Sequence, residues 1–206
     1  MLAAVPLVLL PGTLCDERLF APLLDRLAAR DATVLPIPGG DPETVARQLL
    51  DRAPARFALL GFSLGGLVAL EMALLAPERV LGLAMIDSNA RARAAGAPAH
   101  PGPPAAAIDA IWPRAVGRER HSDDDLRALL EAMANATGPD VHAAQERLAC
   151  ARTDKRDRLP ALTMPALVLA GSQDALCPPP RQQEQADGLP DAILTLIDGV
   201  GHLAPR

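Results

Sequence analysis

The sequence has little cysteine, no excess of positive charge and no long hydrophobic run. Its three cysteines, Cys15, Cys150 and Cys177, form no C-x-x-C pair. The sequence therefore predicts neither a disulfide framework nor a zinc knuckle, and a reducing compartment fits it. The formal net charge of −5 argues against a nucleic-acid partner, because binding phosphates requires clustered positive charge. No apolar stretch reaches the roughly 18 residues that a membrane-spanning helix needs.

The apolar start, Met1–Leu10, lacks a basic leading segment and runs into Pro11-Gly12 without a small-residue cleavage site. It therefore does not resemble a signal peptide, and we expect a cytoplasmic protein with no membrane partner. A chain of 206 residues with 50% hydrophobic residues can bury one sizeable core. We accordingly predict a single domain spanning residues 1–206.

Short apolar runs bounded by turn residues alternate with stretches of helical period, which is the pattern of strand–helix units in a parallel sheet. We expect strands at Val5–Leu10, Thr33–Ile37, Phe57–Leu60, Leu81–Ile86, Ala166–Ala170 and Ile193–Ile197. Helices are expected at Arg18–Arg30, Pro42–Asp51, Ser63–Ala76 and Pro178–Ala186. The predicted fold class is therefore α/β, a mostly parallel open sheet with helices on both faces.

Residues 89–160 interrupt this alternation between two strands. The stretch Ala94–Ala107 is rich in alanine, proline and glycine, whereas Asp123–Ala136 and Asp140–Cys150 have a helical pattern. We interpret 89–160 as a small helical cap inserted within the domain and lying on the sheet. Its linker-like part, Arg91–Pro104, is the segment that we expect to be most mobile.

The most informative motif is Gly61-Phe62-Ser63-Leu64-Gly65, which ends a buried strand and opens an apolar helix. A serine on such a tight turn is held in a strained conformation, so the positions two residues before and after it must be glycine. The sequence therefore predicts Ser63 as a nucleophile presented at the carboxyl edge of the sheet. A plain glycine-rich or phosphate-binding turn would explain the glycines, but not the two residues considered next.

Two further residues follow predicted strands: Asp174 comes after an apolar run, and His202 stands in a glycine-framed loop. A serine hydroxyl needs a base within hydrogen-bond reach, and an imidazole base needs a carboxylate that fixes its tautomer. The order Ser63, Asp174, His202 predicts nucleophile, acid and base that meet at one edge of the sheet. Asp87, which follows Leu81–Ile86, is the alternative acid.

The other three histidines are not directly preceded by glycine as His202 is. We interpret His100, His121 and His142 as solvated or packing residues. His142 and Glu146 are one helical turn apart, but two ligands do not make a metal site, so no metal is predicted. Cys15 and Cys177 are interpreted as packing or incidental residues.

An acyl-transfer site also needs two backbone donors aimed at the oxyanion. One donor is the residue after the nucleophile, and the other lies in the loop after the first strand. The candidates in this sequence are the amides of Leu64 and Thr13.

Together these motifs resemble the α/β-hydrolase superfamily, in particular short bacterial members that have a Pro-Gly-x-x-Cys-Asp loop, a Gly-Phe-Ser-Leu-Gly-Gly elbow and a late Gly-His-Leu. The resemblance runs from about Val5 to His202, except for the cap. It implies the strand order second, first, third, fourth, fifth, sixth, the triad roles given above and no cofactor. Pro11 departs from the histidine that many relatives carry before the loop glycine.

A second departure is that only Leu203–Arg206 follows the histidine, where relatives usually have a helix. We therefore expect one sheet face near the last strand to be partly uncovered. Our hypothesis is that self-association covers this face, or that the chain is truncated.

The sequence thus predicts a serine hydrolase that cleaves a small ester or thioester through an acyl-enzyme. The same triad also supports acyl transfer and carbon–carbon hydrolysis, and the fold cannot choose between these reactions. A non-catalytic ligand-binding protein on the same fold is the alternative from another class.

Overall fold

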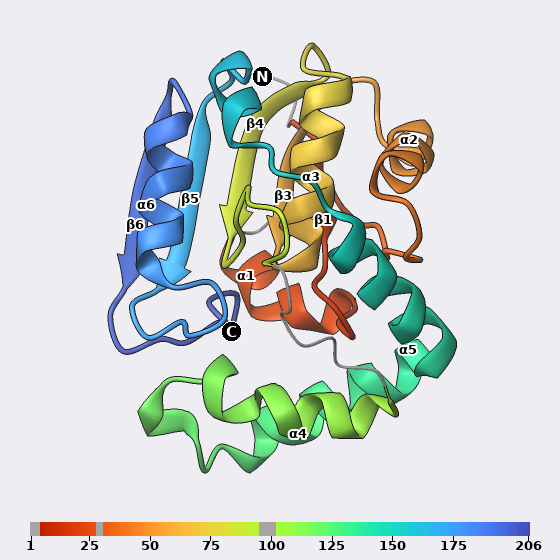
Figure 1. Cartoon of the computed structure of the whole chain (residues 1–206), viewed down its shortest axis with the longest axis vertical. Coiled ribbons are helices and arrows are strands. Elements are labelled where there is room, and N and C mark those ends of the chain that lie inside the picture. Colours follow the sequence, from red (N-terminus) through yellow and green to blue (C-terminus); the bar gives the residue numbers. More distant parts are fainter. Residues whose placement is uncertain (1–4, 28–30, 95–101) are drawn as a thin grey trace.

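A computed structural model describes residues 5–27, 31–94 and 102–206 (Figure 1). Its centre is a six-stranded, fully parallel sheet with the order β2-β1-β3-β4-β5-β6. The strands are β1 (Leu7–Leu10), β2 (Ala32–Val34), β3 (Phe57–Phe62), β4 (Val80–Ile86), β5 (Ala166–Gly171) and β6 (Ala192–Ile197). The α/β fold class and the strand order predicted from the sequence are confirmed. β2 is shorter than predicted and begins one residue earlier, at Ala32.

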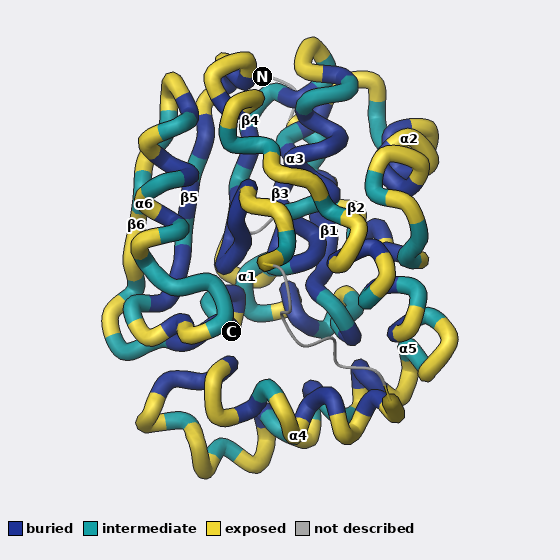
Figure 2. The backbone as a smooth tube through the Cα atoms, viewed as in Figure 1, coloured by how far each residue is buried: buried dark blue, intermediate teal, exposed yellow. Residues whose placement is uncertain are grey.

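Helices cover both faces of this sheet and divide its core into two clusters. On one face, α2 (Pro42–Arg52), α3 (Leu64–Leu75) and α6 (Pro179–Gly188) pack on alternate residues of the strands, such as Val8, Leu59 and Val168. On the other face, the short η1 (Glu17–Phe20) and α1 (Ala21–Leu27) pack near Leu9 and Leu60. Figure 2 shows β3 and α3 among the most deeply buried parts. Ser63, between them, therefore stands on a rigid support.

The segment between β4 and β5 crosses the carboxyl ends of the strands, whose arrowheads point toward α4 in Figure 1, and then returns to the opposite edge of the sheet, where β5 begins. It contains α4 (Pro104–Ala115), η2 (Arg118–Arg120), α5 (Asp124–Ala151) and η3 (Arg156–Ala161). α5 is two helices joined at Gly138, whose φ of 77° is not helical. The helices predicted at 123–136 and 140–150 are thus confirmed.

α4 is a correction to the sequence analysis, which assigned no helix to the stretch rich in alanine, proline and glycine. Pro103 and Pro104 stand at the N-cap and first turn of this helix, where a proline costs no hydrogen bond, and the alanines that follow favour helix. The predicted mobile segment Arg91–Pro104 falls partly on residues 95–101, which lie outside the described residues.

The edge strand β6 is only partly covered, as expected. Ile193 is 69% exposed and Leu196 is 42% exposed, although Leu194 packs against the core. Within the described residues, no helix combines the length and the apolar character needed to cross a membrane.

Candidate active site

Ser63 occupies a sharp turn between β3 and α3. Its φ of 51° and ψ of −114° are strained for a residue with a side chain, and its backbone N–H donates to the carbonyl of Ile86 at 2.9 Å. A Cβ on Gly65 would stand 2.0 Å from the carbonyl oxygen of Leu10, and one on Gly61 would stand 2.5 Å from that of Gly65. Both glycines are therefore required by close backbone contacts, Gly61 within the turn and Gly65 against the end of β1.

The structure brings Ser63, His202 and Asp174 together from the ends of three different strands. The Oγ of Ser63 lies 2.8 Å from Nε2 of His202, and Nδ1 of His202 lies 2.8 Å from Oδ2 of Asp174. The other carboxylate oxygen of Asp174 accepts hydrogen bonds from the backbone N–H groups of Leu176 and Cys177, both at 2.8 Å. Because these bonds fix the carboxylate, the imidazole is held in one orientation between the acid and the hydroxyl.

The surroundings of His202 raise its pKa. Burial disfavours the imidazolium, but the charge of Asp174, its hydrogen bond and the charge of Asp87 together outweigh the burial. An imidazole that is paired with a carboxylate is a stronger base than an unpaired imidazole. His202 is suited to receive a proton from Ser63.

Asp87, the alternative acid, lies in the same region but makes no hydrogen bond to the imidazole of His202. Its carboxylate accepts from the backbone N–H of Gly171 at 3.1 Å and from that of Ala204 at 2.9 Å. It therefore ties together the two loops that carry Asp174 and His202. Burial raises the pKa of Asp87 to about 7, with a further contribution from Asp174, against the opposing effect of His202.

The loop after β1 is held in place by a glutamine that the sequence analysis did not single out. The buried Gln145, on α5, accepts from the backbone N–H of Leu14 at 3.0 Å and donates to the carbonyl of Ile37 at 2.9 Å. Leu14 itself has a φ of 60°. In the described part of the chain, the amides of Thr13 and Leu64 have no such intramolecular acceptor. No local sequence signal could have found Gln145, because it lies 131 residues from its partner.

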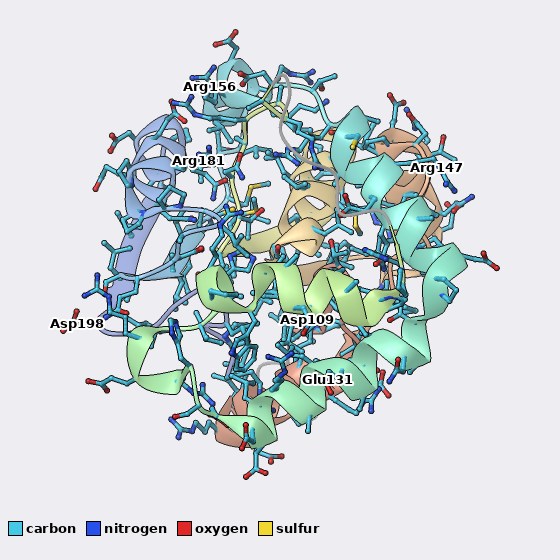
Figure 3. The ribbon with its side chains drawn as sticks, turned by 60° about the horizontal axis from the view of Figure 1, so that its bottom comes forward. Asp109, Glu131, Arg147, Arg156, Arg181 and Asp198 are labelled. Carbon is cyan, nitrogen blue, oxygen red and sulfur yellow. The ribbon has the colours of Figure 1, made fainter. Side chains whose placement is uncertain are left out.

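A cavity of about 240 Å³ lies at Ser63, and Thr13, Leu64 and His202 line it too. Part of its wall is apolar and comes from α4, from the first half of α5 and from the chain after His202: Ala107, Ile108, Ile111, Leu130 and Leu203. Figure 3 shows α4, labelled at Asp109, beside the first half of α5, labelled at Glu131. Arg127 of α5 pairs with both of these carboxylates, which joins the two helices at the cavity.

The remaining histidines differ in position. His121 is exposed, whereas His142 is buried and lines the cavity, and His100 lies outside the described residues. Glu146 pairs with Arg93 at 3.8 Å rather than joining His142 as a ligand. Cys15 and Cys177 also line the cavity, and burial raises the pKa of each thiol to about 12, which makes both poor nucleophiles.

One group in the described residues brings three potential metal-ligand atoms within 4.8 Å of one another, namely Asp174, Cys177 and His202. Two of these three residues are already bonded to each other. A metal here would have to compete with the hydrogen bond that Nδ1 of His202 donates to Asp174 and with the protonation of the thiol.

Comparison with known proteins identifies the family. The family described as alpha/beta hydrolase fold matches residues 45–205. The chain is 31% identical over 188 residues to a pimeloyl-[acyl-carrier protein] methyl ester esterase from Klebsiella pneumoniae, covering 78% of this chain and 68% of the relative. Among solved structures, a thermophilic esterase from Thermogutta terrifontis superposes with a TM-score of 0.83 at 25% identity, covering 98% of this chain and 84% of the other.

An enol-lactonase from Burkholderia xenovorans superposes with a TM-score of 0.78 at 22% identity over 98% of this chain and 86% of its own. At that identity the likeness concerns the fold alone. The family match spans well over half of the chain, and the esterase relative agrees with it. The chain therefore belongs to the α/β-hydrolase family and is an enzyme of that family.

Proposed function

We propose that this enzyme is a serine hydrolase that cleaves a small ester or thioester through an acyl-enzyme. The observation that carries the proposal is the continuous hydrogen-bonded series from Asp174 through His202 to Ser63, with 2.8 Å at each step. The esterase among its relatives supports an ester as the substrate class.

In the first half of the reaction, Oγ of Ser63 attacks the carbonyl carbon while its proton passes to Nε2 of His202. Asp174 stabilises the imidazolium that forms. The tetrahedral intermediate collapses as His202 returns the proton to the leaving alkoxide or thiolate, and the acyl group stays on Ser63. In the second half, His202 takes a proton from a water molecule as that water attacks the acyl carbon. His202 then returns the proton to Oγ of Ser63 as the bond between Oγ and the acyl carbon breaks and the carboxylic acid leaves.

The oxyanion of each intermediate is proposed to accept hydrogen bonds from the amides of Thr13 and Leu64. Leu64 opens α3, so its N–H has no acceptor within the helix, and the helix dipole favours negative charge there. The neighbouring amide of Leu14 is already bonded to Gln145, whereas the amide of Thr13 donates to no acceptor among the described residues. Residues 89–160 act as a cap that shapes the acyl or alcohol pocket through α4 and α5.

The test is labelling with a fluorophosphonate and hydrolysis of 4-nitrophenyl butyrate by the wild type and by Ser63→Ala. Ser122→Ala is a matched control, because Ser122 is exposed and does not line the cavity. We expect labelling and turnover in the wild type and the control, and neither in Ser63→Ala. A folded wild type that neither labels nor turns over would instead favour a ligand-binding protein on this fold.

A further inference from the structure

The cavity at Ser63 has a cationic wall in a protein whose formal net charge is −5. Three arginines line it, and they come from three elements: Arg93 after β4, Arg152 at the end of α5 and Arg181 in α6. Figure 3 labels Arg181 on α6. The same cavity is lined by one carboxylate, Glu146, and by apolar residues of several segments, including Ala149 of α5 and Leu176 before α6.

Two of these arginines have no carboxylate partner among the described residues. Arg152 donates to the carbonyls of Arg91 at 3.1 Å and Ala149 at 2.9 Å, and to no acid. The side chain of Arg181 makes no hydrogen bond or ion pair within the described parts of the chain. Arg93, by contrast, is paired with Glu146 at 3.8 Å.

Some other arginines have carboxylate partners, whereas Arg79 and Arg114 donate only to backbone carbonyls. Arg91 and Arg156, which lie close by, both bind Glu184, and Arg47 binds Glu43. Burial lowers the pKa of Arg152, and the positive charges of Arg93 and Arg181 lower it further. These guanidinium groups thus repel one another inside the cavity wall, and a bound anion would relieve that repulsion.

A histidine stands in the same wall. His142 is 2% exposed and lines the cavity, yet its imidazole has no hydrogen-bond partner among the residues that the structure describes. A ligand or a water molecule in the cavity can therefore hydrogen-bond to this ring. The cavity therefore offers two guanidinium groups without a carboxylate partner, one imidazole and several apolar side chains.

We propose that this cavity selects esters that carry a second, ionised carboxylate, which Arg152 and Arg181 bind in the lining beside Ser63. The substrate class is then a half ester of a short dicarboxylic acid, whose hydrocarbon part contacts the apolar wall. Guanidinium groups suit a carboxylate because two parallel N–H donors match its two oxygens. This inference rests on the proposed hydrolysis at Ser63 and names the substrate for it.

The experiment compares two activated esters that share one leaving group, mono-4-nitrophenyl glutarate and 4-nitrophenyl pentanoate. They differ by a carboxylate in place of a terminal methyl group. We measure the ratio of their kcat/KM values in the wild type, Arg152→Gln and Arg181→Gln. Arg47→Gln is the control, because it removes a positive charge that is exposed and outside the cavity.

The wild type and the control should prefer the glutarate ester, and each of the two cavity variants should lower the ratio by about tenfold or more. A wild-type ratio at or below one, or a ratio that survives both variants, overturns the anion subsite while the Ser63-dependent hydrolysis stands. Competitive inhibition by inorganic phosphate but not by glutarate would also overturn it, in favour of a phosphate ligand.

Failure of the hydrolase proposal gives a different result, namely no Ser63-dependent release of nitrophenol from either ester. The subsite is then tested without catalysis, by calorimetric titration of glutarate into the Ser63→Ala protein and into the same protein with Arg181→Gln. Saturable binding that Arg181→Gln weakens by about tenfold supports the subsite. Absence of binding in both proteins refutes it.

Discussion

Replacing Asp174 by asparagine separates the roles of the two carboxylates that lie near His202. The backbone N–H groups of Leu176 and Cys177 both point at Oδ1 of Asp174. In Asp174→Asn these donors keep the amide oxygen where it is, so the NH2 group faces Nδ1 of His202. The imidazole must then accept at Nδ1 and carry its proton at Nε2, where it cannot take the proton of Ser63.

This reversal of the tautomer sets the expected magnitude. A wrong tautomer together with loss of the carboxylate charge lowers kcat by about 10⁴-fold in a Ser-His-Asp site. The pKa of His202, which Asp174 raises, should fall at the same time, so the residual activity should rise with pH at a lower pH than in the wild type. Both changes follow from one contact of 2.8 Å.

The matched variant is Asp87→Asn. Asp87 accepts from the amides of Gly171 and Ala204, and an asparagine can satisfy only one of them. We expect a stability loss of about 1–3 kcal/mol at pH 5, and a reduction in kcat no greater than about tenfold. The assay is steady-state hydrolysis of 4-nitrophenyl butyrate from pH 5 to pH 9, with urea unfolding of each variant.

The reasoning would be refuted if Asp87→Asn lost as much activity as Asp174→Asn, or if Asp174→Asn kept more than about one tenth of the wild-type kcat. The first result would make Asp87 the acid, as the sequence allowed. The second would mean that the imidazole needs no carboxylate partner.

Three further perturbations test other parts of the site. Since burial raises the pKa of Asp87 to about 7, its contribution to the free energy of unfolding should fall as the pH rises from about 4 to about 7. In urea titrations, the free energy of unfolding of the wild type should fall by up to about 4 kcal/mol relative to that of Asp87→Asn across this pH range. If the two proteins show the same dependence of stability on pH, the raised pKa of Asp87 is contradicted. Gln145→Ala should lower kcat about ten- to hundredfold, because it releases Leu14 and its loop. Gln145→Glu keeps the acceptor for the amide of Leu14 and should retain more activity. Equal kcat values in the two variants would argue that Gln145 does not position this loop. Gly65→Ala should cost more than about 4 kcal/mol because its Cβ would meet a backbone oxygen at 2.0 Å, while Gly82→Ala, with 3.6 Å of room, serves as the control in a thermal melt.

The strands and the turn at Ser63 could be predicted because their signals are local. A strand buried on both faces requires a continuous apolar run, and the turn requires glycine at fixed positions. The positions of Asp174 and His202 followed from the same logic, since the carboxyl ends of parallel strands share one edge. Which carboxylate contacts the imidazole, however, depends on loop geometry that the sequence did not specify.

The cavity wall could not be predicted for a different reason. Arg152 and Arg181 lie 29 positions apart, and their unpaired state depends on where every nearby acid side chain points. α4 was missed because Pro104 normally marks the end of regular structure, and only its place in the first turn makes it compatible with a helix. Such properties arise from long-range packing rather than from local composition.

The contact from Gln145 to the loop after β1 links two parts of this protein that protein engineers usually treat as interchangeable modules. Grafting a different segment between β4 and β5, in order to alter the preferred substrate, would also remove the side chain that holds Leu14. Such a chimaera would be expected to turn over slowly for reasons unrelated to substrate fit. Selection of new specificities in this enzyme is therefore constrained to sequences that keep a hydrogen-bonding side chain at position 145.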